Sequence, residues 1–362
     1  MKNNYYYDLK EDITEFPKDW AYIIIGGRNT GKTYSSLMYA MKNKIKFVFI
    51  KRTIEDIDLL CAGSGQIGSK QNEYGIDLSP FKSINRDAGT NIRAFSIKKG
   101  LGGFWECDED GTPSGSPIGY LIALSAVQKF KGFDLSDCEL IIFDEFIPQP
   151  WERINKKEGE QMLDLYKTVS RDREHRGREA LKLICLANAV SISNPVCNTL
   201  EITDIIAEMQ IRDEEYFHIE ERGILIHLIH DNAEFLDKEK NSLIYKAMSN
   251  TAWGRMAFDN SFAYNDFSSI SKTYLKGYRC QLHVHYKEND YYIYMKDGVY
   301  YMCRSLGFPL LGDYDLNLEN DQKAFYTDWA IDLRNKCISG KMKFQTYTMY
   351  DLIVNYKKFF IV

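Results

Sequence analysis

Short apolar runs alternate with amphipathic stretches over the first two hundred residues. Four of these runs have the length and composition of buried strands, at 20–26, 46–52, 139–145 and 181–187. Between them, residues 32–43 and 158–175 carry apolar side chains at helical spacing, with Gly177 placed to end the second helix. Alternating strands and helices are typical of a mostly parallel α/β sheet. The pattern therefore predicts an α/β domain over residues 1–200.

Turn-forming residues interrupt this alternation. Residues 62–75 are rich in glycine and serine and are expected to form a loop. The strand-like runs 91–97 and 119–126 flank the turn-rich segment DEDGTPSGSP, so we expect a long hairpin there. Residues 200–250 mix a helical pattern with one strand pair that turns at Gly223.

The last third of the chain is rich in tyrosine and in strand-like segments. Strands are expected at 281–286 and 290–295, the second followed by a turn at Asp297 and its neighbouring glycine. We therefore expect a second, smaller and strand-rich domain at the C-terminal end. The predicted organisation is a first domain, a linker region and a second domain at residues 1–200, 201–252 and 253–362.

Composition narrows the class of protein. With 362 residues, 44% of them hydrophobic and 27% charged, the chain has the size and content of a two-domain soluble protein. No apolar run approaches the ~20 residues of a membrane helix, so no membrane partner is expected. Eight cysteines lie scattered without a CxxC pair, which favours reduced thiols in a cytosolic protein. A net charge of −5 indicates that any nucleic-acid contact is local.

One segment has the spacing of a phosphate-binding loop. The sequence GGRNTGKT matches GxxxxGK[ST] and lies between a predicted strand and a predicted helix. Its glycines let backbone N–H groups surround phosphate oxygens, and the helix N-terminus adds its positive dipole end. The lysine is expected to reach the β and γ phosphates, and the threonine hydroxyl to ligate Mg²⁺. The predicted nucleotide-binding residues are Gly26, Gly27, Arg28, Asn29, Thr30, Gly31, Lys32 and Thr33.

A second apolar strand ends in two carboxylates, Asp144 and Glu145. We expect this strand beside the strand of the phosphate loop, with Asp144 holding the magnesium shell. Glu145, one residue further, is placed to orient or deprotonate an attacking water, unless it is only a solvated strand end. Asn188 follows the strand 181–187 and either senses the γ phosphate or caps a helix through an Asx turn. Together these residues favour ATP hydrolysis.

Arginine is concentrated in the run SRDREHRGR at 170–178. The predicted helix ends here, near the open edge of the nucleotide site. Arg176 and Arg178 flank Gly177, where positive charge complements the helix dipole, and are expected to be structural. Arg173 is a candidate to pair with Asp172 or Glu174 or to reach the phosphates, an alternative that the sequence leaves open.

These pieces together resemble the DNA-packaging ATPases, or DNA encapsidation proteins, of small protein-primed tailed bacteriophages. The resemblance rests on IIIGGRNTGKTY, FVFIKRT, LIIFDEFI, TVSRDRE and CLANAVSISNP, in that order and at matching intervals. MAFDNSF at 256–262 resembles a segment just past the ATPase domain in that family. The match covers most of residues 20–200 and is patchier beyond them.

The resemblance implies a P-loop ATPase domain of the additional-strand, catalytic-glutamate type and a C-terminal domain with a ribonuclease-H-like fold. It implies a homomeric ring, usually a pentamer, docked on the portal of a procapsid, in relatives through a ring of packaging RNA. Such a ring uses ATP and Mg²⁺ to drive double-stranded viral DNA into the procapsid. It acts in the host cell cytoplasm, attached transiently to the procapsid, and is absent from the mature virion.

The resemblance also implies roles for three basic residues by their position. Arg171 matches an arginine that acts in trans on the ATP of the neighbouring subunit. A guanidinium in that place can stabilise charge on the transferring phosphoryl group. Lys131, in QKFKGF, matches a lysine beside the shared nucleotide site. Arg52 ends the second strand, where related motors keep basic residues.

Acidic residues in the C-terminal domain raise the question of a nuclease, because larger phage terminases gather carboxylates there around two metal ions. No strand-borne set with the required spacing is evident among Asp259, Asp266, Asp290, Asp297, Asp313 and Asp315. We therefore expect no nuclease activity. His283 and His285 share a face of a strand with Cys280 nearby, but a fourth ligand is not evident, so ordinary histidines are favoured over a metal site.

The same domain is the expected nucleic-acid surface, because basic residues alternate there with tyrosine and phenylalanine. The basic residues are Lys276, Arg279, Lys341, Lys343, Lys357 and Lys358. Tyrosine-rich strands are also simply good strand formers. Three alternatives stay open at this point: a terminase-like ATPase with an active nuclease, a helicase or recombinase ATPase, and a nucleotide-switched binding module.

Overall fold

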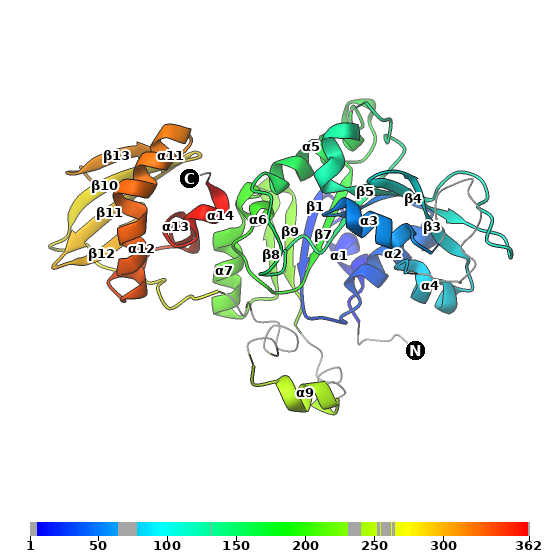
Figure 1. Cartoon of the computed structure of the whole chain (residues 1–362), viewed down its shortest axis with the longest axis horizontal. Helices are drawn as coiled ribbons and strands as arrows, with labels where there is room; N and C mark the ends of the chain where they lie inside the picture. Colours follow the sequence, from blue (N-terminus) through cyan, green and yellow to red (C-terminus); the bar gives the residue numbers. More distant parts are fainter. Residues whose placement is uncertain are drawn as a thin grey trace. The chain divides into compact units, whose positions relative to one another are not determined.

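The structure, a computed structural model, describes residues 6–63, 78–130, 132–230, 240–251, 254, 262 and 265–360. The chain forms two compact units (Figure 1). The N-terminal unit comprises residues 1–152, 160–191 and 212–263. The C-terminal unit comprises residues 153–159, 192–211 and 264–362.

The described part of the N-terminal unit is built on one mixed sheet. Its strands are β1 (Ala21–Ile25), β2 (Phe47–Lys51), β3 (Ile92–Lys98), β4 (Leu101–Glu106), β5 (Gly119–Ala123), β6 (Leu140–Asp144), β7 (Lys182–Ala187), β8 (Tyr216–Ile219) and β9 (Ile224–Leu228). They pair in the order β3-β4-β5-β2-β6-β7-β1-β9-β8. The six central strands, β5, β2, β6, β7, β1 and β9, run parallel to one another (Figure 1). At the edges, β3 and β4 pair antiparallel, β4 pairs antiparallel with β5, and β8 pairs antiparallel with β9. This confirms a mixed α/β domain with a large, mostly parallel sheet.

Helices cover this sheet. They are α1 (Leu9–Glu15), α2 (Lys32–Lys42), α3 (Ile54–Cys61), α4 (Phe81–Ala88) and α5 (Glu158–Ser170). Strands β1 and β6 are buried over their whole length, as expected for apolar runs enclosed on both faces. Helix α3 begins with a capping box, in which Thr53 and Asp56 bond each other's backbone N–H groups.

Strand β7 lies between β1 and β6. The expectation that the acidic strand lies beside the strand of the phosphate loop is therefore wrong. Both strands pair with β7 instead, Ile25 with Ala187 and Asp144 with Leu186. The extra strand brings the polar residue that follows it, Asn188, between the two motifs.

The predicted hairpin around DEDGTPSGSP is present, but its first strand is β4 and not 91–97, because β4 pairs antiparallel with both β5 and β3. Two adjacent glycines broke the alternating pattern that would have revealed β4. A Cβ added at Gly102 would lie 2.7 Å from the Phe95 carbonyl oxygen, and one at Gly103 would lie 2.8 Å from the Trp105 ring. These glycines therefore allow the close approach of neighbouring groups.

Helix α5 ends earlier than the apolar periodicity predicts. Its last residue is Ser170, and Arg171 then adopts the left-handed conformation with φ 43°. Gly177, with φ 69°, ends a short 3₁₀ helix over residues 174–176 instead of α5. The arginines of the run therefore lie beyond the end of α5, in a turn and a short 3₁₀ helix.

The segment expected as a linker region, 201–252, contains regular elements, including α7 (Thr203–Arg212) and α9 (Leu243–Met248). The predicted strand pair is present as β8 and β9, and Gly223 lies at its turn with φ 59°. Strand β9 also pairs in parallel with β1, so its apolar residues are buried within the large sheet. The predicted loop at 62–75 lies mostly outside the described residues.

The C-terminal unit contains a second sheet. Its described strands are β10 (Arg279–Tyr286), β11 (Asn289–Lys296), β12 (Val299–Cys303), β13 (Gly312–Asp315) and β14 (Met342–Phe344), in the order β13-β10-β11-β12-β14. Strands β10, β11 and β12 form an antiparallel meander. Strand β13 runs parallel to β10, and strand β14 runs parallel to β12. The predicted turn between β11 and β12 has positive φ at Asp297 and Gly298.

Four described helices contribute to a hydrophobic core on this sheet, namely α11 (Glu319–Phe325), α12 (Ile331–Ile338), α13 (Tyr347–Ile353) and α14 (Tyr356–Phe359) (Figure 1). Helices α6 (Pro195–Thr199) and α7 belong to the same unit. One carboxylate, Asp351 of α13, is buried at 5% exposure and accepts hydrogen bonds from Ser193 and Asn355. Burial raises its pKa to about 7. None of the helices in the described residues is long and apolar enough to span a bilayer.

Candidate functional site

The phosphate-loop motif, the acidic strand end and Asn188 meet at one edge of the large sheet. Strands β1, β6 and β7 are parallel, so their C-terminal ends lie together, as at the ligand edge of other α/β sheets. A pocket of about 340 Å³ opens there. It is lined by Arg28, Asn29, Thr30, Gly31, Lys32, Thr33, Tyr34, Asp144, Glu145, Leu186, Ala187 and Asn188. Most of the predicted site residues therefore share one pocket.

The loop itself turns on two residues with positive φ. Asn29 has φ 63° and Gly31 has φ 84°. The left-handed region is open to glycine and tolerated by asparagine, which explains these residue types at the two positions. Helix α2 starts immediately afterwards at Lys32, so its N-terminal N–H groups point into the region of the pocket.

Lys32 is buried at 9% exposure. Its ammonium donates to the carbonyl oxygens of Gly26 and Gly27, at 3.1 Å and 2.6 Å, and to the Thr30 hydroxyl at 3.0 Å. It also lies 3.4 Å from the Asn188 side-chain oxygen. The loop thus holds a positive charge at its base, which is the arrangement that binding of phosphate oxygens requires.

Oxygen ligands suited to Mg²⁺ lie next to this charge. The Thr33 hydroxyl donates to Asp144 Oδ1 at 2.7 Å, although the two residues are 111 positions apart in the sequence. Asp144 is buried at 8% exposure. A hydroxyl and a carboxylate are hard oxygen donors, and Mg²⁺ in nucleotide sites typically takes one or two such ligands in addition to phosphates and water. The two residues therefore fit a magnesium site.

Glu145 directly follows β6 in the left-handed conformation, with φ 59°. Its side chain is 62% exposed and lines the pocket. Arg52 holds its backbone, because the guanidinium donates to the carbonyl oxygens of Glu145 and Phe146 at 2.9 Å and 3.2 Å. Arg52 also pairs with Glu152 at 2.7 Å. Arg52 therefore supports the backbone of the acidic pair.

Sequence reasoning missed Lys51. This residue ends β2, and its ammonium lies 2.8 Å from Asp144 Oδ2 and 3.0 Å from Glu145 Oε2. Burial lowers the pKa of Lys51, but the attraction of the two carboxylates outweighs this effect, and the pKa is raised overall. A lysine that ends a buried strand was a signal in the sequence. Its partners could be known only once β2 was placed beside β6.

A second, larger cavity of about 930 Å³ adjoins the phosphate loop. It shares Asn29, Gly31 and Tyr34 with the pocket at the strand ends. Its other lining residues include three more tyrosines, Tyr6, Tyr7 and Tyr39. Aromatic rings next to a phosphate-binding loop provide stacking surfaces for a planar ligand group.

Residues 114–306, which are more than half of the chain, match the family described as Podovirus DNA encapsidation protein (Gp16). The chain belongs to this family. A DNA packaging protein of Bacillus phage B103 is 27% identical over 343 residues, which cover 92% of this chain and 85% of that protein. The DNA packaging protein of Bacillus phage phi29 is 24% identical over 248 residues, or 66% of this chain and 61% of that protein. The function supported by the family is that of a DNA-packaging motor.

Solved structures share the fold of this encapsidation protein. A chain of the bacteriophage Phi-29 viral genome packaging motor assembly superposes with a TM-score of 0.63 at 19% identity, over 98% of this chain and 99% of the other. A chain of the Phi-28 gp11 DNA packaging motor gives a TM-score of 0.61 at 18% identity, over 99% and 97% of the two chains. The common fold therefore extends over almost the whole encapsidation protein.

In this family member, Arg171 is bound within its own chain. Its guanidinium donates to the Phe133 carbonyl at 2.8 Å and lies 3.5 Å from Asp134, and its side chain is 40% exposed. Lys131, the other basic residue assigned by resemblance, lies outside the described residues. The action of Arg171 in trans stays a prediction. In this structure its side chain instead contacts the segment that begins at Phe133.

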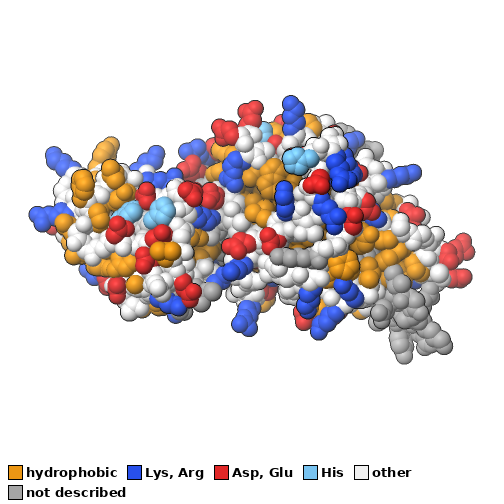
Figure 2. All heavy atoms as spheres, turned by 90° about the horizontal axis from the view of Figure 1, so that it is seen from above, with side chains coloured by type: hydrophobic (Ala, Val, Ile, Leu, Met, Phe, Trp, Pro, Cys, Tyr) orange, Lys and Arg blue, Asp and Glu red, His pale blue; other side chains and the backbone are white. Residues whose placement is uncertain are grey.

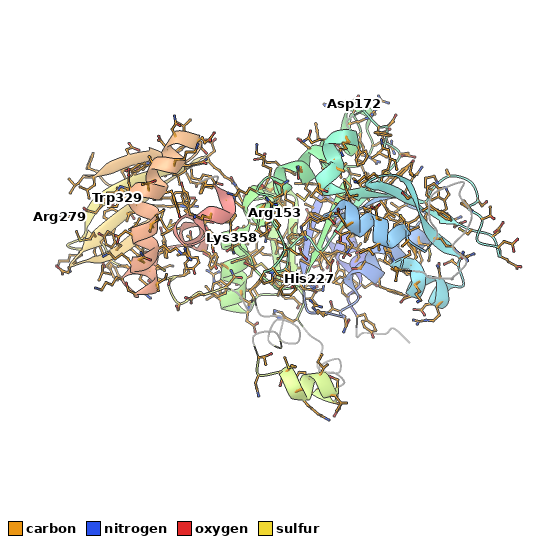
Figure 3. The ribbon with its side chains drawn as sticks, in the orientation of Figure 1. Arg153, Asp172, His227, Arg279, Trp329 and Lys358 are labelled. Carbon is orange, nitrogen blue, oxygen red and sulfur yellow. The ribbon has the colours of Figure 1, made fainter. Side chains whose placement is uncertain are left out.

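Two of the other arginines of the run, Arg173 and Arg178, also contact this segment. Arg173 is buried at 6% exposure and donates to the Cys138 carbonyl, so the prediction that it pairs with a neighbouring carboxylate or reaches the phosphates is wrong. Arg178 donates to the Ser136 carbonyl at 3.1 Å. Arg176 lies 3.5 Å from Asp172, which is labelled in Figure 3. In this structure the arginines of the run therefore stabilise the segment 133–138 through its backbone carbonyl oxygens.

In the C-terminal unit, the structure gives the two histidines acidic partners. His283 bonds both Asp290 and Asp313, at 2.9 Å and 2.8 Å, and His285 bonds Asp290 at 2.8 Å. Figure 2 shows histidine side chains next to acidic side chains on the surface of this unit. Cys280 instead packs with tyrosines in a separate cluster. The described parts of the chain contain no group of three or more histidine, cysteine, aspartate or glutamate side chains that could hold a metal ion.

Proposed function

We propose that this encapsidation protein is an ATP-hydrolysing subunit of a ring motor that drives double-stranded viral DNA through the portal into a procapsid. The observation that carries the proposal is the convergence of Lys32, Thr33, Asp144, Glu145 and Asn188 on one pocket at the ends of parallel strands. This combination suits hydrolysis better than switching alone, because Glu145 adds a carboxylate beyond the metal-binding one.

Each residue of the site has a distinct role in this proposal. Lys32 supplies the buried positive charge for the β and γ phosphates, and Thr33 with Asp144 holds Mg²⁺. When bound, Mg²⁺ neutralises charge on the phosphates. Glu145 orients and deprotonates the attacking water. Asn188 lies within hydrogen-bond distance of Lys32, so it is placed to link occupancy of the phosphate site to β7.

We propose ATP as the nucleotide from the resemblance to the packaging ATPases, and the adjoining cavity provides room for its base. The tyrosine-lined space of about 930 Å³ begins where the phosphate loop ends, and it is large enough for a base and a sugar. Tyr34 donates a hydrogen bond to Asp87 at 3.1 Å, which fixes one ring at the cavity wall. A nucleotide with its phosphates on Lys32 can place its base there.

We further propose that the subunits form a homopentameric ring, in which Arg171 and Lys131 act on the nucleotide of the neighbouring subunit. The ring is proposed to bind the portal protein of a procapsid, with packaging RNA as a further partner, in the host cell cytoplasm, and to leave before the virion matures. In the resting chain Arg171 is bound to Phe133 and Asp134, so the trans contact requires its release.

For the C-terminal unit, we propose a ribonuclease-H-like domain that binds nucleic acid without cutting it. Its mixed sheet with helices packed against it supports the fold assignment. Arg279, labelled in Figure 3, is exposed at the start of β10 and is one of the basic residues available to phosphates. Asp290 and Asp313 are hydrogen-bonded to His283, and Asp259 lies outside the described residues. Nicking of supercoiled DNA with Mg²⁺ or Mn²⁺ would contradict this proposal.

The test of the proposed function is a paired measurement of ATP hydrolysis and DNA packaging with purified procapsids. Lys32→Ala should abolish both activities, because the phosphates lose the charge at the base of the loop. Lys18→Ala removes an exposed lysine of the same unit and should leave both unchanged. ATP hydrolysis that survives in Lys32→Ala, or packaging that proceeds without hydrolysis, would contradict the assignment.

A further inference from the structure

The segment that leads into α1 contacts the phosphate loop and the helix after it. The Tyr7 backbone N–H donates to the Thr30 carbonyl oxygen at 3.0 Å. Two residues further, the Leu9 N–H donates to the Ser35 hydroxyl in the first turn of α2 at 2.9 Å. We call residues 7–9 the strap, because they tie the start of α1 to the loop and to α2.

The contact with Thr30 fixes one peptide group of the loop. A trans peptide is planar, so its C=O and N–H groups point in opposite directions, and no cis peptide occurs among the described residues. The peptide between Thr30 and Gly31 has its oxygen on the Tyr7 N–H, so the Gly31 N–H points away from the strap. Gly31 has φ 84°, and a glycine can leave this conformation for others at little cost. The strap therefore selects one direction for an N–H group of the phosphate loop.

The strap is itself anchored in a buried hydrogen-bond network. Asp12 of α1 is 2% exposed, and its Oδ2 accepts from the Tyr7 hydroxyl at 2.9 Å. The same oxygen lies 2.9 Å from Nδ1 of His227, which is buried in β9 and labelled in Figure 3. On the other side of the imidazole, Nε2 lies 3.5 Å from Glu215. Polar groups that find partners in a buried network hold a single arrangement, so this network fixes the Tyr7 side chain.

The anchor leads back to the loop through the sheet. His227 pairs with Ile24 of β1, the strand that enters the phosphate loop. Burial, and then the negative charge of Asp12, raises the pKa of Tyr7 well above its ordinary value, so the hydroxyl keeps the proton that it donates. The strap is thus held by α1 and β9, and it holds the loop from the side opposite its attachment to β1.

We propose that Tyr7 is a positioning residue of the nucleotide site, which keeps the peptide between Thr30 and Gly31 in the orientation that binds a phosphate group. This inference rests on the proposed nucleotide-binding function of the same loop. Backbone N–H groups of such a loop bind phosphate oxygens, so a wrongly turned peptide removes one donor. The acidic pair of β6 belongs to another element. Loss of the strap contact should therefore weaken nucleotide binding and leave kcat at saturating ATP in place.

The experiment measures binding of a fluorescent non-hydrolysable ATP analogue with Mg²⁺ to the full-length protein. Tyr7→Phe keeps the ring and loses the bond to Asp12, whereas Tyr7→Pro removes both the side-chain anchor and the N–H that binds Thr30. The dissociation constant should rise about 3–10-fold in Tyr7→Phe and about 10–100-fold in Tyr7→Pro, because apparent affinity falls with the fraction of loops in the binding orientation. In Tyr7→Phe, kcat at saturating ATP should stay within about twofold of wild type.

His218→Phe is the matched control. His218 lies in β8, and its Nε2 is 3.0 Å from Oδ1 of the buried Asp19, so the variant breaks another histidine–aspartate contact of the same unit. It keeps a ring beside Phe16, as Tyr7→Phe keeps the ring of Tyr7. The dissociation constant should equal that of wild type. An equal rise in His218→Phe and Tyr7→Phe would overturn the inference, because it would reflect a general loosening of the unit.

The possible failures can be told apart. An unchanged dissociation constant in folded Tyr7→Phe and Tyr7→Pro would overturn the role of Tyr7 and leave the proposed function intact. A lower kcat with unchanged binding in Tyr7→Phe would also overturn it, because the strap acts on binding. If Tyr7→Pro fails to fold, Asp12→Asn, which weakens the anchor, replaces it and should act like Tyr7→Phe. Absence of analogue binding by the wild-type protein would overturn the proposed function and this inference together.

Discussion

The buried carboxyl of Asp351 makes the stability of the C-terminal unit depend on pH. Asp351 is 5% exposed, and it accepts hydrogen bonds from Ser193 at 2.6 Å and from Asn355 at 2.7 Å. Burial raises its pKa from 3.8 to about 7, and the hydrogen bonds and the nearby Lys358 offset only part of that effect. Replacement by asparagine keeps the shape and removes the titration, so Asp351→Asn is the perturbation of choice.

The sign and size of the effect follow from the raised pKa. Between pH 3.8 and about pH 7 the folded protein keeps a proton on Asp351 that the unfolded chain releases. The stabilising contribution is therefore complete below pH 3.8 and is lost as pH rises to about 7. A shift of roughly three units corresponds to about 4 kcal/mol, of which about 3 kcal/mol falls between about pH 5 and about pH 8.

The assay compares wild type with Asp351→Asn by hydrogen exchange of the amides in α13, which reports local opening of this helix. Relative to wild type, the variant should gain about 3 kcal/mol of opening free energy between about pH 5 and about pH 8. Asp332→Asn, at a 57% exposed carboxylate of α12, is the matched control and should show no such gain. A constant difference between wild type and Asp351→Asn at every pH would refute the reasoning.

Three further predictions concern the site and the sheet. Mixing Arg171→Ala subunits with Glu145→Gln subunits should restore part of the ATPase activity that each lacks, because one interface then holds both groups; no recovery at any ratio would refute the trans role. Thr33→Val removes the hydroxyl that donates to Asp144 and should raise the Mg²⁺ concentration for half-maximal hydrolysis about 10-fold or more. An unchanged Mg²⁺ titration would contradict the role of Thr33 as a magnesium ligand. Gly119→Ala places a Cβ 2.6 Å from the Phe47 ring and should lower the free energy of unfolding by about 1–3 kcal/mol. Urea titration measures this change, and unaltered stability would contradict the close packing.

Much of the nucleotide site was predictable because its signals are local. The spacing of glycines, Lys32 and Thr33 marks the loop, and an apolar strand that ends in Asp144 and Glu145 marks its acidic partner. The hydrogen bond from Thr33 to Asp144 agrees with this expectation. Asn188 was also identified from a strand end, and the structure places it near Lys32.

Other features could not be derived from local patterns. Strand β4 escaped detection because Gly102 and Gly103 interrupt its alternation, and the close neighbour that requires Gly102, the Phe95 carbonyl oxygen, lies on the adjacent strand β3. Arg173 was considered as a partner of a neighbouring carboxylate or of the phosphates, yet it is buried on the Cys138 carbonyl, 35 positions away. In both cases the decisive contact joins two different elements of the fold, which local patterns do not reveal.

The sequence by itself determined the strand–loop–helix of the predicted phosphate site, the acidic strand end and the two-part organisation, because spacing and hydrophobic period express these features within short segments. Only the tertiary structure decided the strand order. That order places β7 between β1 and β6, and it places β2 on the other side of β6. Strand order brings Lys51 to Asp144 and Glu145 across a gap of more than 90 residues, and such pairings depend on the packing of the whole sheet and not on any local pattern.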